Sequence, residues 1–499
     1  MEDKETAWKD LHRLTSERDG KVRERAAYVL RSIIQFVPDK ETAWNDLIRL
    51  TGDKDEKVRA RAADALGSAF QFVPDKETAW KDLIKQTSNQ KRCVRRRAAD
   101  ALGSAFQFVP DKETAWKDLI KLTSDQNGYV ARRVTDTLGS VFQFVLDKEI
   151  AWEDLYRLTS HQDYLVREWA TDALGSAFQF IPDKEAAWKD LVRLTSRQNN
   201  EVRWRTVDVL RLAFQFVPDK ETAWKDLIRL THHQDSYVQL KAADALSSAF
   251  QLVLDKETAW KDLHRLTSDE DSEVRARAAY ALRSIIQFVP DKETAWKDLI
   301  RLTGDRDDSV GERAADALRS VFQFVPDKET AWKDLHTLTC DQKGYVRWRA
   351  VDALRSAFQL VPDKETAWED LHRLTSDQDD NVREMAADAL GSAFQFVPEK
   401  ETARRDLIRL TQDAVSDVRC TSYHSLGRIS ILIATQEEDD FRTHLEEAIE
   451  FFRKSSEEAI YFNPAAFCLP FYLSLHSLLF TEVPKEEEVQ KYLTDAKKQ

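Results

Sequence analysis

The chain has 499 residues, of which 42% are hydrophobic and 33% are charged, and its net charge is −13 at pH 7. This composition is typical of a soluble, helix-rich protein, and the 12 glycines and 12 prolines are too few for long disordered linkers. The acidic balance argues against a nucleic-acid partner on average, although an average can hide a basic face.

The four cysteines are scattered along the chain, at Cys93, Cys340, Cys420 and Cys468, without CxxC spacing. This distribution argues against a disulfide framework or a zinc site, and it favours a reducing, cytoplasmic location. The first residues, MEDKETAW, lie inside the repeat described next and carry no basic or apolar leader, so we expect no secretion signal.

A tryptophan recurs every 36 residues from the beginning of the chain. It lies at Trp8, Trp44, Trp80, Trp116, Trp152, Trp188, Trp224, Trp260, Trp296, Trp332 and Trp368. The twelfth register holds Arg404, where the repeat is still recognisable, so we count twelve units from Asp3 to about Ile433. Recurrence at a fixed period of this size indicates a repeat architecture.

Each unit is predicted to contain two helices, as the ninth unit illustrates. Asp291 follows Pro290 and can cap a first helix, with Glu293 near the positive end of the helix dipole. After the break at TGDRDD, Asp307 can cap a second helix, which ends by Pro326. The apolar stripe of the first helix is Ala295, Trp296, Leu299, Ile300 and Leu302, and that of the second is Val310, Ala314, Ala317, Leu318 and Val321.

Neither helix can bury its apolar stripe alone, but successive helix pairs can stack and share one continuous core. We therefore interpret the recurring tryptophan as a packing residue, with a ligand-binding residue as the alternative. A stack of this kind is a solenoid, in which each unit contacts only its neighbours.

The second helices carry a motif that resembles a known repeat family. The segments DSEVRARAAYALRS (271–284) and DNVREMAADALGS (380–392) resemble the signature of HEAT repeats, in particular the subgroup named after phycobilisome lyases. The valine is present in all twelve units, and the following arginine in nine, the exceptions being Ala131, Gln239 and Gly311. The resemblance implies that this aspartate and arginine form a ladder between units, so that Asp271 and Arg275 are structural. The whole chain is also similar to uncharacterised archaeal HEAT-repeat proteins.

The predicted fold is therefore all-α: a right-handed α-solenoid of about twelve 36-residue, two-helix HEAT repeats with a helical C-terminal cap. We expect the solenoid to comprise residues 1–434 and the capping segment residues 435–499. In the cap, 437–459 reads as an amphipathic helix, and 484–499 as a polar closing helix. The apolar segment 459–480 is predicted to be a buried helix pair, with a partner-binding groove or a membrane anchor as alternatives.

No catalytic or metal-binding pattern stands out. No histidine is followed by glutamate, as the di-iron hydroxylases among HEAT proteins would require, and no glycine-rich phosphate loop or nucleophile elbow is present. His12, His264, His336 and His372 occupy one repeat position, which favours a semi-buried packing site over a row of metal ligands. The adjacent His232 and His233 are expected to be solvated in a loop. We therefore predict no enzyme activity, no metal and no cofactor.

The second helices are the expected binding surface, because in HEAT solenoids they line the concave side. Seventeen residues after the tryptophan an arginine is common, and twenty residues after it an aspartate, which predicts neutralising pairs within one helix such as Arg61–Asp64. The second helices of the first four units nevertheless carry an excess of about eight positive charges, which favours an acidic partner.

Aromatic residues replace polar ones along the same helices, either as an interaction surface or as packing between helix starts. The candidate partner-binding residues are Arg96, Arg97, Arg132, Arg133, Tyr129, Tyr164, Trp169, Trp204, Tyr237, Tyr345 and Trp348.

The predicted function is a non-catalytic scaffold that binds a partner protein or peptide on the concave face, without a membrane. The alternative is nucleic-acid binding through the concave arginines, with aromatic side chains stacking on bases. A third possibility is a non-catalytic subunit or adaptor of an enzyme complex.

Overall fold

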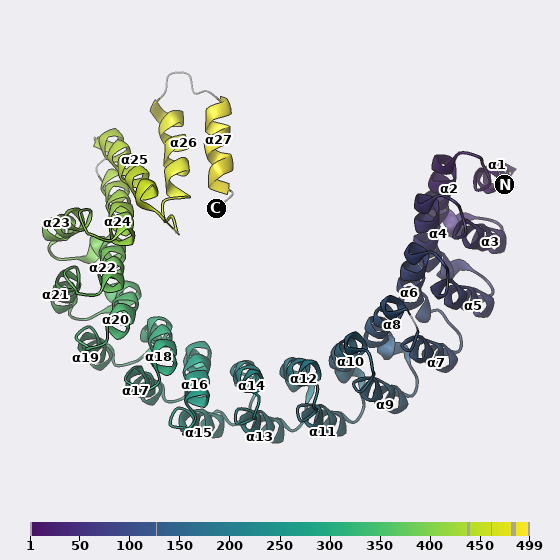
Figure 1. Cartoon of the computed structure of the whole chain (residues 1–499), viewed down its shortest axis with the longest axis horizontal. Coiled ribbons are helices and arrows are strands. Elements are labelled where there is room, and N and C mark those ends of the chain that lie inside the picture. The colour runs from purple at the N-terminus through teal and green to yellow at the C-terminus, as the bar shows by residue number, and fades with distance from the viewer. Residues whose placement is uncertain (1, 126, 437–439, 461, 481–485, 498–499) are drawn as a thin grey trace. The chain divides into compact units, whose positions relative to one another are not determined.

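The computed structural model describes residues 2–125, 127–436, 440–460, 462–480 and 486–497. Within these ranges the regular elements are α-helices and short 3-10 turns, in repeating pairs (Figure 1). The chain divides into two compact structural units, each made of several of the 36-residue repeats: Met1–Leu254 (unit 1) and Asp255–Gln499 (unit 2). Each unit is described by itself.

Unit 1 is a stack of seven helix pairs. Its first helices are α1 (Glu2–Leu14), α3 (Lys40–Leu50), α5 (Lys76–Thr87), α7 (Lys112–Leu122), α9 (Lys148–Leu158), α11 (Lys184–Leu194) and α13 (Lys220–Leu230). Its second helices are α2 (Gly20–Ile33), α4 (Glu56–Ala69), α6 (Arg92–Phe106), α8 (Gly128–Val141), α10 (Tyr164–Ala177), α12 (Asn200–Ala213) and α14 (Ser236–Ala249). The second helices form the inner row of the curved stack, and the first helices form the outer row (Figure 1).

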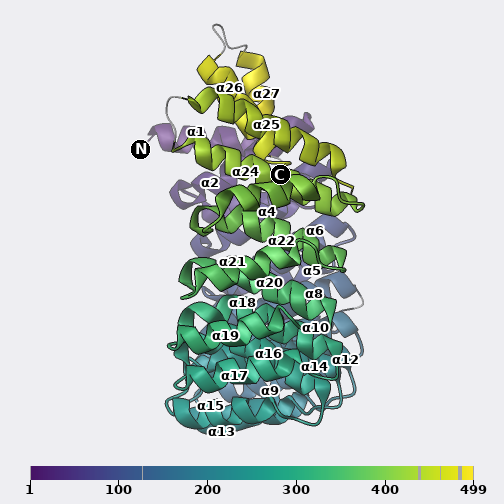
Figure 2. The same cartoon turned by 90° about the vertical axis from the view of Figure 1, so that its left-hand side faces the viewer.

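Unit 2 contains five further pairs and three additional helices. The second helices of the pairs lie one above another in the stack (Figure 2). The first helices are α15 (Lys256–Leu266), α17 (Lys292–Thr303), α19 (Lys328–Leu338), α21 (Lys364–Leu374) and α23 (Lys400–Leu410). The second helices are α16 (Ser272–Ile285), α18 (Asp308–Val321), α20 (Gly344–Ala357), α22 (Asp380–Ala393) and α24 (Ser416–Ala434). They are followed by α25 (Phe441–Glu458), α26 (Cys468–Phe480) and α27 (Glu486–Lys497). The predicted all-α solenoid of two-helix repeats is thus confirmed.

Aspartate side chains start the helices at the predicted places. Asp291 Oδ1 accepts a hydrogen bond of 2.9 Å from the backbone N–H of Thr294, and the Thr294 hydroxyl donates to Asp291 Oδ2 at 2.6 Å. These hydrogen bonds lower the pKa of Asp291. Asp307 caps α18 by accepting from the N–H of Ser309 at 3.0 Å. Each cap satisfies N–H groups that have no partner inside the helix.

The recurring tryptophan packs in the core and also bonds to the next repeat. Trp296 is 2% exposed, and its ring meets Phe322 edge-on at a centroid distance of 5.7 Å. Its indole N–H donates to Asp334 of the following repeat at 3.0 Å. The same bond, at 3.0–3.2 Å, joins Trp44 to Asp82, Trp80 to Asp118, Trp116 to Asp154, Trp152 to Asp190 and Trp188 to Asp226. The packing interpretation is confirmed, and the bond sets the register between neighbouring repeats.

Where a histidine follows the tryptophan by four residues, the histidine takes over this bond. Nδ1 of the ring lies 2.5–2.6 Å from Oδ2 of the equivalent aspartate in His12–Asp46, His264–Asp298, His336–Asp370 and His372–Asp406. The histidine side chains are 42–50% exposed, and their rings lie 5.5–5.8 Å from those of the tryptophans in a tilted arrangement, whereas the aspartates are buried. The histidines therefore hold the repeats together by a hydrogen bond as well as by packing.

The arginine ladder is present, but its acid is not the one that the motif suggested. Arg275 binds Asp305 of the next repeat through two hydrogen bonds of 2.7 and 2.8 Å, and it also donates to the backbone carbonyls of Asp269 and Glu270. Asp271 instead caps α16 by accepting from the N–H of Glu273 at 2.9 Å. Asp271 is therefore a cap, because its side chain is engaged at the start of its own helix. The same ladder joins Arg23 to Asp53, Arg347 to Asp377 and Arg383 to Asp413.

Asp305→Ala is expected to destabilise unit 2 by about 2–3 kcal/mol, because it leaves the largely buried guanidinium of Arg275 without its carboxylate. The hydrogen bond from Arg275 lowers the pKa of Asp305, so this contribution is present above the ordinary aspartate pKa and is lost as the pH falls through the lowered value. Asp341→Ala is the control. Asp341 accepts the equivalent backbone hydrogen bond, from Lys343, but the preceding repeat has Gly311 in place of the arginine. Denaturant titration at neutral pH should show a cost of only about 1 kcal/mol for the control, and equal costs would contradict the ladder.

The C-terminal helices agree only in part with the sequence. In α25 the predicted face is present, with Leu445, Ile449 and Phe452 buried, and the Ser455 hydroxyl donates to the Cys420 carbonyl of α24 at 2.9 Å. The expected buried helix pair at 459–480 is wrong for the described residues, which contain one helix, α26, preceded by non-helical residues. Its apolar surface stays open, with exposed fractions of 38–54% at Phe471, Leu478 and Leu479. Residues 437–439, 461, 481–485 and 498–499 of the predicted segments lie outside the described residues.

The capping role of residues 435–499 stays a prediction. No helix within the described ranges is long and apolar enough to cross a membrane.

Candidate protein-binding face

The candidate residues of unit 1 lie near the starts of neighbouring second helices, α6 to α14. Helix α8 begins after Asn127, whose side chain accepts from the N–H of Tyr129, and α10 begins after Asp163, which accepts from the N–H of Leu165. These caps fix the first turns, and helical periodicity then places residues three and four positions apart on one side of each helix.

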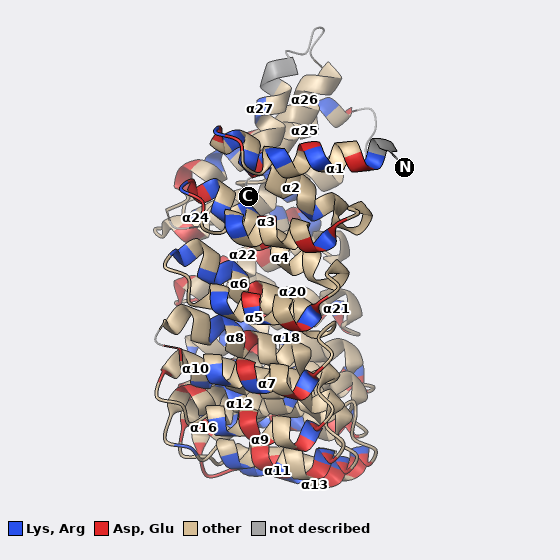
Figure 3. Cartoon of the chain, turned by 90° about the vertical axis from the view of Figure 1, so that its right-hand side faces the viewer, with Lys and Arg blue, Asp and Glu red and all other residues tan. Residues whose placement is uncertain are grey.

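The outer helices show alternating basic and acidic segments along their length (Figure 3).

Two of the predicted arginines are neutralised by the preceding repeat. Arg133 donates to Asp100 through Nε at 2.7 Å, and Arg97 forms an ion pair with Asp64. Burial acts to lower the pKa of Arg133, but the hydrogen bond and attraction of Asp100 outweigh it and raise this pKa.

The predicted pair Arg61–Asp64 is wrong, because both side chains pair with neighbouring repeats. Arg61 instead lies 3.5 Å from Glu24 of the preceding repeat. The equivalent pair within one helix does form between Arg133 and Asp136, at 3.2 Å.

Three arginines of the same face have no carboxylate within ion-pair distance in the part of the chain that the structure describes. They are Arg92 and Arg96 at the start of α6 and Arg132 in α8. Arg92 lies over the ring of Tyr129 at 5.8 Å, and Arg132 lies over the ring of Trp169 at 5.0 Å. Arg96 is exposed. Arg92 was not among the predicted site residues, although its position one helical turn before Arg96 indicates the same basic surface.

The aromatic residues form two groups on this face. Trp169 is half-buried beneath Arg132, while Tyr164 in the same helix is 55% exposed. Trp204 is also half-buried, with its ring 4.8 Å from that of Tyr237 and its indole N–H bonded to Asp235. The two tryptophans are thus less exposed than expected, because each is covered or bonded by a neighbouring repeat.

Tyr345 and Trp348 belong to unit 2 and form a separate site. They line a cavity of about 370 Å³ together with Asp308, Glu312, Arg349, Asp379 and Asn381. The Tyr345 hydroxyl donates to Asp308 at 2.8 Å, and Arg349 lies over the Trp348 ring at 4.1 Å while it pairs with Glu312 at 2.5 Å. Burial raises the pKa of Tyr345. Carboxylates dominate the charges at this cavity.

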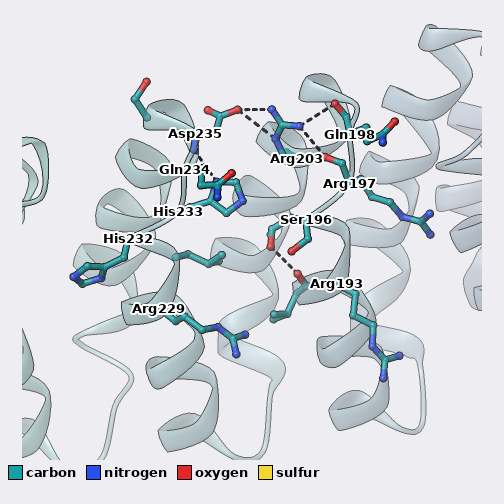
Figure 4. A pocket seen from close by; sticks show the side chains of 14 residues that line it. Arg193, Ser196, Arg197, Gln198, Arg203, Arg229, His232, His233, Gln234 and Asp235 are labelled. Carbon is teal, nitrogen blue, oxygen red and sulfur yellow. Dashed lines mark hydrogen bonds and ion pairs between the residues drawn. The ribbon is translucent and has the colours of Figure 1, made fainter. Parts of the chain in front are cut away.

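A larger cavity of about 1070 Å³ lies in unit 1, between the inter-helix loops of the sixth and seventh repeats (Figure 4). His232 and His233, which were expected to be simply solvated, line it with Arg193, Arg197 and Arg229. Within the described residues, no group of three or more His, Cys, Asp or Glu side chains could hold a metal ion.

Comparisons with known proteins agree with this architecture. Residues 188–283, 225–319 and 333–427 match the model of HEAT repeats. No curated protein sequence matches the chain. The predicted HEAT repeats are thereby confirmed, whereas the phycobilisome-lyase subgroup and the archaeal similarity stay predictions.

Several solved karyopherin structures share the fold. Kap121p bound to the SUMO protease Ulp1p has a TM-score of 0.63 and 13% identity, over 97% of this chain and 54% of that chain. Kap121p bound to Nup53p has a TM-score of 0.62 and 13% identity, over 99% and 57% of the two chains. Importin beta has a TM-score of 0.53 and 13% identity, over 99% and 75%. The chain spans about half the length of the Kap121p chains, and the likeness concerns the fold alone.

Proposed function

We propose that this HEAT-repeat solenoid is a non-catalytic scaffold that binds an acidic partner protein on the second-helix face of unit 1. The observation that carries the proposal is the row formed by Arg92, Arg96 and Arg132, which have no carboxylate partners in the described part of the chain. A row of unpaired cations on an acidic protein attracts acidic groups and speeds their association.

The aromatic residues supply the second part of the proposed interface. Trp169, Trp204 and Tyr237 lie on neighbouring helices α10, α12 and α14, next to the arginines of α6 and α8. Half-buried tryptophans held by their neighbours need little ordering on binding, and Trp, Tyr and Arg are the residue types enriched at interaction hot spots. The shared fold adds support, because Kap121p is found bound to protein partners.

Protein binding is favoured over nucleic-acid binding because neighbouring side chains already contact the two tryptophan rings. Arg132 already covers Trp169, and Trp204 is tied to Asp235 and Tyr237. Stacking of bases on these rings would require displacement of those contacts. An acidic side chain can pair with the arginines while they remain over the rings.

The double variant Arg96→Glu with Arg132→Glu is expected to weaken binding of the purified partner at least about tenfold, because like charges then face each other. The matched control is Lys81→Glu with Lys117→Glu, which changes the net charge equally in the same two repeats but on the exposed outer helices α5 and α7. Titration calorimetry at constant ionic strength measures both. Equal losses would mean that only net charge matters, and unchanged binding in both would overturn the proposed face.

A further inference from the structure

At the cavity between the loops of the sixth and seventh repeats, the position of the ladder acid is occupied by Arg197 and His233 instead of aspartate. The ladder acid lies three residues before each second helix, and it is an aspartate in most repeats, such as Asp305 and Asp377. In three successive repeats of unit 1 this position holds His161, Arg197 and His233. Three neighbouring loops therefore lack the negative charge of the ladder aspartate, and one of them carries the positive charge of Arg197 instead.

The two histidines keep the backbone contact of the aspartate but not its charge. Asp305 Oδ1 accepts from the N–H of Asp307 at 2.9 Å. In the same way, His233 Nδ1 accepts from the N–H of Asp235 at 3.0 Å, and His161 Nδ1 accepts from the N–H of Asp163 at 3.1 Å. A ring nitrogen that accepts carries no proton, so the proton of the neutral ring is on Nε2, which is a donor. His233 lines the cavity and brings this donor to it.

The missing ladder acid also changes the arginines around the cavity. Arg203, which lacks its usual partner, turns to the capping Asp235 and binds it at 2.6 Å (Figure 4). Burial acts to raise the pKa of Asp235, but the hydrogen bonds from Arg203 and Trp204 outweigh it and lower this pKa. The carboxylate that lines the cavity is thus already paired. In the repeat before, Arg167 keeps a buried Nε without a hydrogen-bond partner.

Three more arginines line the cavity with donors to spare. Arg197 lies over the ring of Tyr156 at 5.5 Å, without an ion pair within the described residues. Arg193 and Arg229, on α11 and α13, each use one nitrogen on a carboxylate of their own helix, Asp190 at 3.0 Å and Asp226 at 2.9 Å. A guanidinium group has five N–H donors, so most of them remain available.

We propose that this cavity binds a ligand that carries at least two phosphoryl groups. Phosphoryl oxygens match the forked donors of arginine, and the charge of each group exceeds that of a carboxylate. Arginines on the first helices α11 and α13 of neighbouring repeats, and on the loop between α11 and α12, provide more donors than one phosphoryl group can occupy. The volume of about 1070 Å³ is at the upper end of small-ligand pockets. The site lies on the loop edge and does not rest on the proposed protein-binding face, although Asp235 at the cavity also bonds to Trp204 of that face.

Restoring the repeat's own aspartates gives a test in which the fold is preserved. Arg197→Asp with His233→Asp returns ladder acids to Arg167 and Arg203, removes Arg197 and His233 from the lining and places two carboxylates there. Asn89→Asp is the control, because it restores the same position in the third repeat, away from the cavity. Calorimetric titration with inorganic pyrophosphate at low salt should show saturable binding to the original protein and to the control, and at least tenfold weaker binding to the double variant. Thermal unfolding should show that the double variant is at least as stable as the original.

Two further probes identify the source of the phosphoryl groups. Inorganic tripolyphosphate represents a small soluble ligand, and a doubly phosphorylated serine peptide represents a modified protein. Tighter binding of either one supports the site and assigns its ligand class. Absence of saturable pyrophosphate binding, or equal affinity in the original protein and the double variant, would overturn the proposal.

Discussion

Trp296→Ala is expected to lower the free energy of unfolding of unit 2 by about 3–5 kcal/mol, the usual cost of removing a buried tryptophan. The ring is 2% exposed and packs edge-on against Phe322, so its removal leaves a cavity in a dense core. It also removes the hydrogen bond that Asp334 of the next repeat accepts from the indole N–H. Two neighbouring repeats therefore lose contacts from one substitution.

The damage should be local at first, because a repeat contacts only its neighbours. Hydrogen exchange should increase in α17 to α20, and denaturant titration followed by circular dichroism should show the stability loss. Trp348→Ala in the same unit is the control. Its ring is half-buried and is covered by Arg349, so a cost of about 1 kcal/mol is expected. A Trp296→Ala cost no larger than that of the control would contradict a core role for the recurring tryptophan.

Acidification from pH 6.5 to 4 should loosen the contact between α24 and the C-terminal helices. Burial lowers the pKa of His424 to about 4, and the positive charge of Arg428 acts in the same direction against the opposing effect of Asp388. The imidazole lies 5.7 Å from the Phe452 ring of α25 and 3.9 Å from the Cys468 sulfur of α26. A charged imidazole would have to leave this largely apolar contact or draw water into it.

The direction of the effect follows from proton linkage. The folded pKa of His424 lies below its unfolded value of about 6.5, so the unfolded state binds the proton first as the pH falls. The contribution of the neutral His424 to the free energy of unfolding is fully present above about pH 6.5, and up to about 3 kcal/mol of it is lost as the pH falls towards 4.

Thermal unfolding between pH 7 and 4.5 should show this loss in the original protein and a flatter profile in His424→Gln. Identical pH profiles would contradict the assignment. The aspartates with lowered pKa values, such as Asp305 and Asp413, lose their contributions at lower pH and do not interfere.

The period of the sequence predicted the architecture because each repeat is built from local rules. The spacing of Trp296, the caps at Asp291 and Asp307 and the apolar stripes all act within one or two helices, where sequence distance gives spatial distance. The interactions between repeats were harder to predict. Arg61 was assigned to Asp64 by helix spacing, but stacking brings the closer acid, Glu24, from the neighbouring helix.

The cavity between the sixth and seventh repeats was not predicted, although the sequence contains an indication of it. Arg197 and His233 depart from a position that is aspartate in most repeats, but their meaning depends on the ladder partner, which is thirty residues away and visible only in the stack. The exposed surface of α26 could not be predicted either, since apolar composition alone does not distinguish a buried helix from one with an open face.

The central claim is that the second-helix face of unit 1 recognises an acidic protein. Affinity purification from the native cell, with and without nuclease, tests it most directly when the original protein is compared with Trp169→Ala and with Arg96→Glu plus Arg132→Glu. We predict a protein partner, identified by mass spectrometry, that survives nuclease and is lost with both variants but retained by Lys81→Glu plus Lys117→Glu. Recovery that vanishes with nuclease, or a partner that all variants retain, would contradict the claim.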